Sequence, residues 1–259
     1  MFYPFTISAN TIYNLRSETG SLSGSVDSEK DQRYIQLVKY LSATDGLIDG
    51  KSLKELWFPQ GKYHIFLSHS HADVDLARYF KSWLQAKCDL KCFIDTDVWD
   101  NKDSLLSELE KRFNPSAQRS KTLLLSTHVH SMLTMALFEA IDAIECPILI
   151  ESSNSVTLKD GLDKGTLSPW IYEEVGFMGK LPHKVPSRYP TTKYFSIGTE
   201  SVMLSEHIQD SIKIAHPLDT SNFKSIYSYD LVDLRNYYGT RALDYLYRKK
   251  NLLSRRTIY

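Results

Sequence analysis

Residues 168–174 join a helix start to a carboxylate and an indole, two groups that can hold a polar ligand. Ser168 is suited to accept a hydrogen bond from a free backbone N–H of the first turn. Pro169 fits the first helical position, because its missing N–H has no partner there. Trp170 and Glu174 are four residues apart and therefore share one helix face. The carboxylate either serves a site or complements the positive end of the helix.

The segments that must position this helix alternate between short apolar runs and amphipathic stretches. The apolar run at 147–150 indicates a buried strand, and a polar loop at 152–166 joins it to Ser168. We expect strands at 62–68, 91–95, 147–150 and 193–197, and helices at 28–41, 52–58, 72–87, 103–113, 131–144, 202–215 and, as one or two helices, 223–250. Residues 122–125 fit a strand or a helix start.

The strand and helix order predicts an α/β fold. Short apolar strands that alternate with helices are typical of a parallel sheet with helices on both faces. We expect Ile65, Phe93 and Ile148 on interior strands of that sheet. Residues 1–28 are polar, and we expect a loosely ordered arm there, with a short strand at 2–7.

The charge balance and the composition argue against several classes of function. Lys+Arg and Asp+Glu both number 31, so bulk charge gives no support for binding to nucleic acid or to a membrane surface. No apolar run approaches the ~20 residues of a membrane span, and no signal peptide is expected. The 3 cysteines form no CxxC pair, so we expect buried thiols in a reducing cytoplasm and no metal site.

Three pieces of the chain, in this order and spacing, resemble the Toll/interleukin-1 receptor (TIR) domain family. They are the strand end Ile65–Ser70 with Ala72-Asp73 behind it, the strand Cys92–Asp95 before an acidic loop, and Ser168-Pro169-Trp170 with Glu174. The resemblance covers about residues 62–200. It implies a flavodoxin-like doubly wound parallel sheet with helical N- and C-terminal extensions, divided as 1–61, 62–200 and 201–259.

A rival alignment assigns the family glutamate to Glu139. It makes residues 123–126 the third strand, because family domains usually pass directly from the second helix to the strand before the glutamate. We prefer Glu174, because Trp170 lies four residues before it, whereas Met135 precedes Glu139.

The resemblance implies cleavage of the bond between nicotinamide and ribose in NAD. Glu174 would then stabilise the positive charge that develops on the ribose as nicotinamide leaves. NAD is the substrate and no cofactor is implied, since the chain has no GxGxxG motif after a strand. Doubly wound sheets bind ligands beyond the carboxyl ends of their strands. The substrate-binding residues by that rule and by the motif are Ser68, His69, Ser70, Asp97, Trp99 and Trp170.

Three functional hypotheses follow. The first is a cytoplasmic NAD-consuming enzyme of a bacterial, Thoeris-like antiphage pathway. It would self-associate on activation and reach an effector through an ADP-ribose-derived signal. The second is a non-catalytic TIR-like interaction module, and the third is an enzyme similar to nucleoside deoxyribosyltransferases. The presence of Glu174 favours catalysis, and Trp170 with Ser68-His69-Ser70 favours the TIR family.

Overall fold

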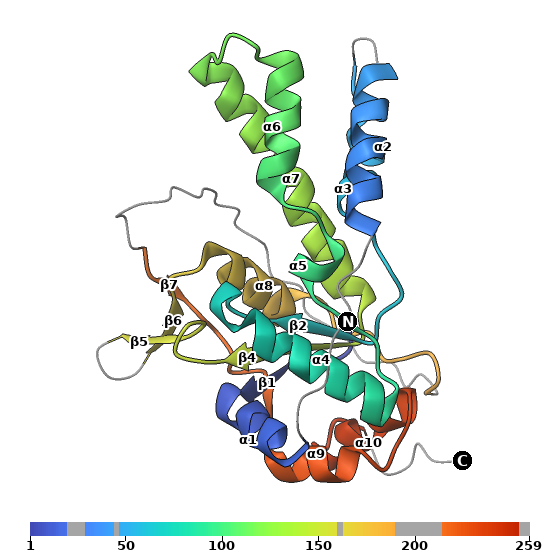
Figure 1. Ribbon diagram of the computed structural model, residues 1–259. Helices are drawn as coiled ribbons and strands as arrows, with labels where there is room; N and C mark the ends of the chain where they lie inside the picture. Colours follow the sequence, from blue (N-terminus) through green and yellow to red (C-terminus); the bar gives the residue numbers. More distant parts are fainter. Residues whose placement is uncertain (20–28, 44–46, 160–162, 190–213, 254–259) are drawn as a thin grey trace. The chain divides into compact units, whose positions relative to one another are not determined.

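The computed structural model describes residues 1–19, 29–43, 47–159, 163–189 and 214–253 (Figure 1). Its chain forms two compact units. The first comprises Met1–Gly24, Lys62–Ile94 and Ile141–Tyr259, and the second comprises Ser25–Gly61 and Asp95–Ala140. The strand expected at 193–197 and most of the helix expected at 202–215 lie outside the described residues.

A five-stranded sheet is the centre of the first unit. Its order is β3-β2-β4-β1-β8, and every neighbouring pair is parallel. The strands are β1 (Phe5–Ser8), β2 (Ile65–Ser68), β3 (Cys92–Phe93), β4 (Cys146–Glu151) and β8 (Lys224–Ile226). The predicted α/β architecture with a parallel sheet is therefore confirmed.

Two expectations about this sheet are wrong. Ile65 and Ile148 lie on interior strands as predicted, but Phe93 lies on β3 at the edge. The N-terminal residues are no loose arm, because β1 pairs with β4 on one side and β8 on the other. The short strand expected at 2–7 is present as β1, in which Phe5 and Ile7 are fully buried, but its place inside the sheet was not expected.

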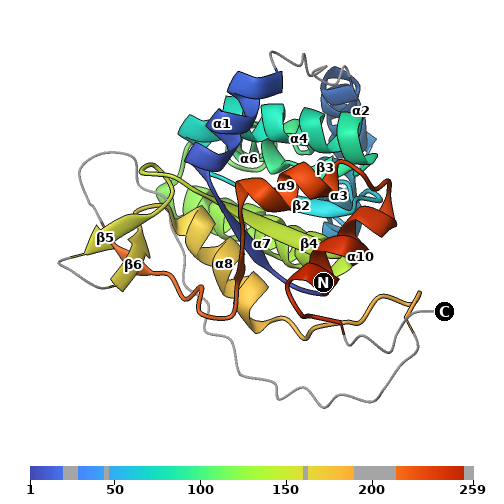
Figure 2. The ribbon, with the colours of Figure 1, turned by 90° about the horizontal axis from the view of Figure 1, so that it is seen from below.

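Helices cover both faces of the sheet (Figure 2). On one face lie α1 (Ala9–Thr19) and α4 (Val74–Cys88), which the short helix η1 (His71–Asp73) precedes. On the other face lies α8 (Pro169–Lys180). The unit also contains α9 (Ser228–Leu234), α10 (Thr240–Lys249) and an antiparallel sheet of β5 (Thr157–Lys159), β6 (Asp163–Thr166) and β7 (His216–Pro217).

Successive side chains of each strand point to opposite faces of the sheet, and those on one face form part of the core. One set of strand side chains packs with apolar residues of α1, α4, α9 and α10 in a single buried cluster. Helix α4 supplies Leu76, Ala77, Phe80, Trp83 and Leu84 to it, at helical spacing. The helix ends at Asp89, whose left-handed φ of 52° lets its N–H bond back to the last turn.

The second unit is helical in its described residues. It contains α2 (Glu29–Ala43), α3 (Gly50–Trp57), α5 (Asp95–Val98), α6 (Lys102–Phe113) and α7 (Arg119–Ala143), whose last three residues belong to the first unit. Residues 122–125, left open between strand and helix, are part of α7. An ion pair of 2.8 Å between Arg33 and Asp100 joins α2 to the loop before α6, and one of 2.5 Å between Lys54 and Glu139 joins α3 to α7.

These units do not follow the boundaries expected from the sequence. The sheet takes strands from all three predicted segments, 1–61, 62–200 and 201–259. Residues 95–140 fall in the unit that also holds residues 25–61. The N- and C-terminal segments are thus partly integral to the sheet.

The position of β1 between β4 and β8 leads to a prediction about stability. Ile7→Ala removes a side chain that is 1% exposed between β4 and β8, so we expect the free energy of unfolding to fall by about 2–5 kcal/mol. The matched control is Tyr13→Ala on α1, where the ring is 51% exposed and we expect a change within about 0.5 kcal/mol. Chemical denaturation measures both. An equally small effect of the two substitutions would contradict the central position of β1.

Candidate functional site

The start of α8 forms as the sequence predicts. The Ser168 hydroxyl accepts a hydrogen bond from the Ile171 N–H at 3.3 Å, and Pro169 occupies the first helical position. Glu174 is the sixth residue of the helix and therefore lies in its second turn. The alternative role of Glu174, as complement to the helix dipole, loses support, because that effect falls off within the first turn.

A buried hydrogen bond joins α8 to the end of β2. The Ser68 hydroxyl donates to Oε2 of Glu174 at 2.5 Å, and the two residues are 0% and 2% exposed. Ile65 and Leu67 belong to the cluster packed with α4, so the alternation of the strand directs Ser68 to the face that α8 covers. A carboxylate is costly to bury without such a donor, so this pair is a built feature of the fold.

His69 follows Ser68 and is also buried, at 6% exposed. Its Nδ1 lies 3.1 Å from the carbonyl oxygen of Leu67. Because a carbonyl oxygen only accepts, Nδ1 carries the hydrogen, and in the neutral ring Nε2 presents a lone pair. Nε2 is buried and has no hydrogen-bond partner among the described residues. Buried polar atoms are nearly always paired in folded proteins, so Nε2 is a candidate ligand acceptor.

Trp170 supplies a hydrogen-bond donor, whereas His69 supplies an acceptor. Its indole Nε1 is buried without a hydrogen-bond partner among the described residues, and an indole N–H can only donate. Trp170 precedes Glu174 by one helical turn, as expected from the sequence. His69, next to Ser68 in the chain, and Trp170, one turn before Glu174, thus supply one buried acceptor and one buried donor.

Asp73 belongs to the sequence pattern behind the end of β2 but was not among the expected site residues. Its buried carboxylate accepts hydrogen bonds from the Ser152 hydroxyl at 2.5 Å and from the Asn154 amide at 2.9 Å. These contacts hold the loop after β4 against the segment after β2. Ser70, the N-cap residue of η1, is half-buried in that same segment. The carboxyl ends of two neighbouring strands are thereby fixed to each other, and the only sequence signal was polar residues after each apolar run.

The structure divides the expected site residues between the two units. Ser68, His69, Ser70, Trp170 and Glu174 lie in the first, and Asp97 and Trp99 lie in the second. Asp97 is half-buried in α5. The Trp99 Nε1 donates to the Pro59 carbonyl at 3.0 Å, and the ring packs edge-on against Phe58 at 5.6 Å between centroids. These contacts give Trp99 a packing role within the second unit.

Glu139, the rival for the family glutamate, has a different environment. It lies on α7 in the second unit, in the ion pair with Lys54, and its side chain is 42% exposed. Met135, one helical turn before Glu139, is also half exposed. Glu174 is the buried carboxylate of the two.

The cysteines are not poised as nucleophiles. Cys88, Cys92 and Cys146 are free and buried, as expected. Burial raises the pKa of the Cys88 thiol to about 12, and it also raises the pKa values of the Cys92 and Cys146 thiols. Nucleophilic thiolate chemistry is therefore disfavoured at all three cysteines.

Comparison with protein-family models, with curated proteins and with solved structures finds no match to this chain. Within the described ranges, no three or more His, Cys, Asp or Glu side chains are grouped so that they could hold a metal ion. None of the helices in the described ranges has both the length and the apolar character required to cross a bilayer.

The packing of Trp99 yields a prediction. Trp99→Ala removes a buried ring and its hydrogen bond to Pro59, so we expect the free energy of unfolding to fall by about 3–5 kcal/mol. Trp99→Phe keeps a ring beside Phe58 and should cost less. The measurement is denaturant unfolding, followed through the helical signal. If Trp99→Ala left stability unchanged but impaired ligand binding, Trp99 would instead be a stacking platform.

Proposed function

We propose that this chain is a TIR-like enzyme, with a flavodoxin-like sheet, that cleaves NAD between nicotinamide and ribose. The observation that carries the proposal is the buried Ser68–Glu174 hydrogen bond at the carboxyl end of β2. Ligands of doubly wound sheets bind beyond the carboxyl ends of the strands. The one buried glutamate of the described residues thus lies where such a fold places its substrate.

The chemistry needs few protein groups. Nicotinamide in NAD is already a cationic leaving group, so its departure requires no strong general acid. The ribose gains oxocarbenium character as the bond breaks, and a fixed carboxylate beside it stabilises that charge. In this proposal the Ser68 hydroxyl holds the Glu174 carboxylate in place, and the carboxylate contacts the ribose. Buried surroundings strengthen the interaction, because little water screens it.

His69 and Trp170 support a substrate with both donors and acceptors. The lone pair on His69 Nε2 can accept from a hydroxyl or amide N–H, and Trp170 Nε1 can donate to a carbonyl or ring nitrogen. NAD carries all of these groups. Ser70 would line the same end of the sheet. The expected contacts of Asp97 and Trp99 with substrate remain predictions, and the packing of Trp99 favours a supporting role for it.

The biological setting extends the same proposal. An NAD-cleaving TIR-like protein would act as a signal producer in bacterial antiphage defence, in the cytoplasm. The signal would be an ADP-ribose derivative that reaches a separate effector, and activation would proceed through self-association. The exposed tyrosines of the C-terminal segment, Tyr227, Tyr229, Tyr237 and Tyr238, provide surface for such assembly.

The central prediction concerns Glu174. Glu174→Gln keeps the shape and the hydrogen bond from Ser68 but removes the negative charge, so turnover of NAD should fall by about 10²–10³, or roughly 3–4 kcal/mol. The melting temperature should change little. Mass spectrometry of nicotinamide and ADP-ribose products measures turnover, with and without infected-cell lysate to supply an activating signal.

Two matched controls test the assignment. Glu173→Gln lies about 100° away around the helix, and Glu139→Gln replaces the rival carboxylate, so both should retain turnover. Loss in Glu139→Gln with activity in Glu174→Gln would move the site to α7. If the activated chain released no nicotinamide at all, a non-catalytic interaction module would be the better account.

The two nitrogens of His69 can be tested separately. Asn in place of His69 can retain the bond to the Leu67 carbonyl but lacks an acceptor at the position of Nε2, whereas Gln can place one there. We therefore expect His69→Asn to raise KM for NAD by about tenfold or more, and His69→Gln to lose less. His71→Asn, at an exposed histidine, is the control. Equal KM values for all four proteins would limit His69 to a structural role.

A further inference from the structure

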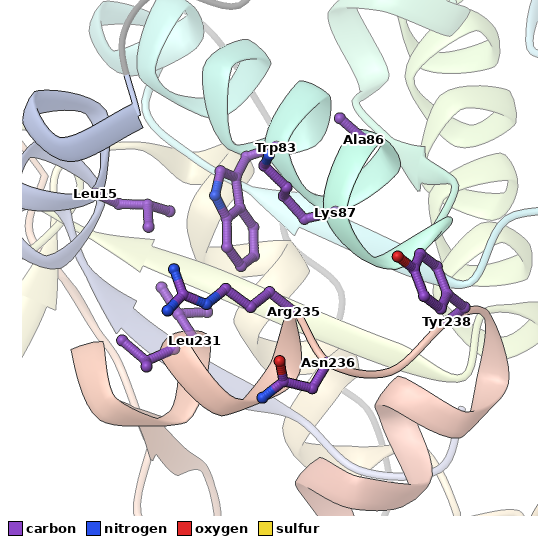
Figure 3. Close-up of a pocket in the computed structure, with 9 residues that line it drawn as sticks. Leu15, Trp83, Ala86, Lys87, Leu231, Arg235, Asn236 and Tyr238 are labelled. Carbon is purple, nitrogen blue, oxygen red and sulfur yellow. The ribbon is translucent and has the colours of Figure 1, made fainter.

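A cleft of about 390 Å³ lies in the first unit (Figure 3), and none of its lining residues belongs to the proposed NAD site. Its volume falls within the range of about 300–1,000 Å³ that is usual for small-molecule sites. The cleft lies among α1, α4 and the segment from α9 to Tyr238. Its lining residues are Leu15, Trp83, Ala86, Lys87, Leu231, Val232, Arg235, Asn236 and Tyr238.

The floor of the cleft is apolar and well supported. Trp83 and Leu231 are each 1% exposed, and Trp83 stacks on Phe80 in the core. Figure 3 shows Trp83 projecting from α4 between Leu15 and Tyr238, with Arg235 below it. Other apolar residues of the lining are open to solvent: the Tyr238 ring is 67% exposed, and Val232 is also exposed. Val232 and Tyr238 therefore add exposed apolar surface to the lining, against which a flat apolar group can lie.

All charged side chains in the lining of the cleft are positive. Lys87 and Arg235 are its ionic groups, and none of the nine residues is acidic. Neither cation takes part in an ion pair within the described part of the chain. Asp233, two residues before Arg235, has a favourable charge interaction with it, but its hydrogen bonds come from the Lys249 ammonium and the Tyr245 hydroxyl, both at 2.7 Å. The lining thus presents an ammonium and a guanidinium, and neither is hydrogen-bonded to a carboxylate within the described residues.

We propose that this cleft binds a small aromatic anion, a planar ring that carries a phosphate or carboxylate group. The guanidinium of Arg235 can hold either group through two parallel N–H bonds, and Lys87 adds a second positive charge. The ring lies against Val232 and Tyr238, and the Asn236 amide supplies a neutral polar contact. A nucleoside monophosphate and an aryl carboxylate share this chemistry. The proposal does not rest on NAD cleavage at Glu174.

The presence of Lys87 and Arg235 has a competing explanation, because both lie at the carboxyl ends of helices. Lys87 lies in the last turn of α4, and Arg235 is the residue that caps the carboxyl end of α9. Cations at these positions complement helix dipoles without any ligand. In that case their removal would lower the melting temperature and change no binding, a pattern that the following experiment separates from the proposal.

The test is calorimetric titration of the full chain with AMP, benzoate, inorganic phosphate and adenosine. We expect AMP or benzoate to bind with Kd of about 1 mM or below, and adenosine and inorganic phosphate to bind at least about tenfold more weakly. Lys87→Met and Arg235→Met keep the aliphatic stems and should each weaken the anion by about tenfold or more. Arg248→Met, at an exposed cation in the last turn of α10, is the matched control and should bind as wild type does.

Three results would overturn the proposal. The first is no saturable binding of AMP or benzoate. The second is binding that persists in both Lys87→Met and Arg235→Met, which would place the anion at another site such as that of Glu174. The third is inorganic phosphate binding as tightly as the aromatic anions, which would reduce the cleft to a general ion contact.

Discussion

The hydrogen bond from Ser68 to Glu174 is the contact on which the proposed chemistry depends. It connects the carboxyl end of an interior strand with the second turn of a helix 106 residues later in the chain. A buried carboxylate without a donor would be costly, and a serine hydroxyl without an acceptor would be costly in the core as well. Each residue therefore accounts for the burial of the other. The same contact fixes the carboxyl group of Glu174 at the carboxyl end of β2, where doubly wound folds bind ligands.

The surrounding structure holds this pair in place from two directions. The parallel sheet places β2 between β3 and β4, and the Asp73 contacts with Ser152 and Asn154 fix the loops that follow β2 and β4. The Ser168 cap and Pro169 define where α8 begins, and hence which residues reach Ser68. The Nδ1 bond of His69 sets its tautomer and leaves Nε2 as an acceptor. Preorganisation of this kind is what an electrostatic mechanism requires.

The sequence was most informative where a local rule decides the structure. The start of α8 follows from a serine and a proline at fixed positions, and the apolar runs at 62–68 and 147–150 predicted two interior strands. A strand was also expected at 2–7, but not the position of β1 inside the sheet, because its burial comes from β4 and β8, which are distant in sequence. The packing of Trp99 against Phe58 and Pro59 and the role of Asp73 also depend on non-local contacts, so no spacing along the chain reveals them.

The most direct test of the account is a crystal structure of the Glu174→Gln chain soaked with NAD. This variant keeps the hydrogen bond to Ser68 and should turn over too slowly to consume the ligand. The account predicts density for NAD at the carboxyl end of β2, with a ribose hydroxyl within about 3 Å of the side-chain amide introduced at position 174. Density for NAD that lies elsewhere on the chain, or an empty site at saturating NAD, would contradict the assignment of Glu174 as the reacting carboxylate.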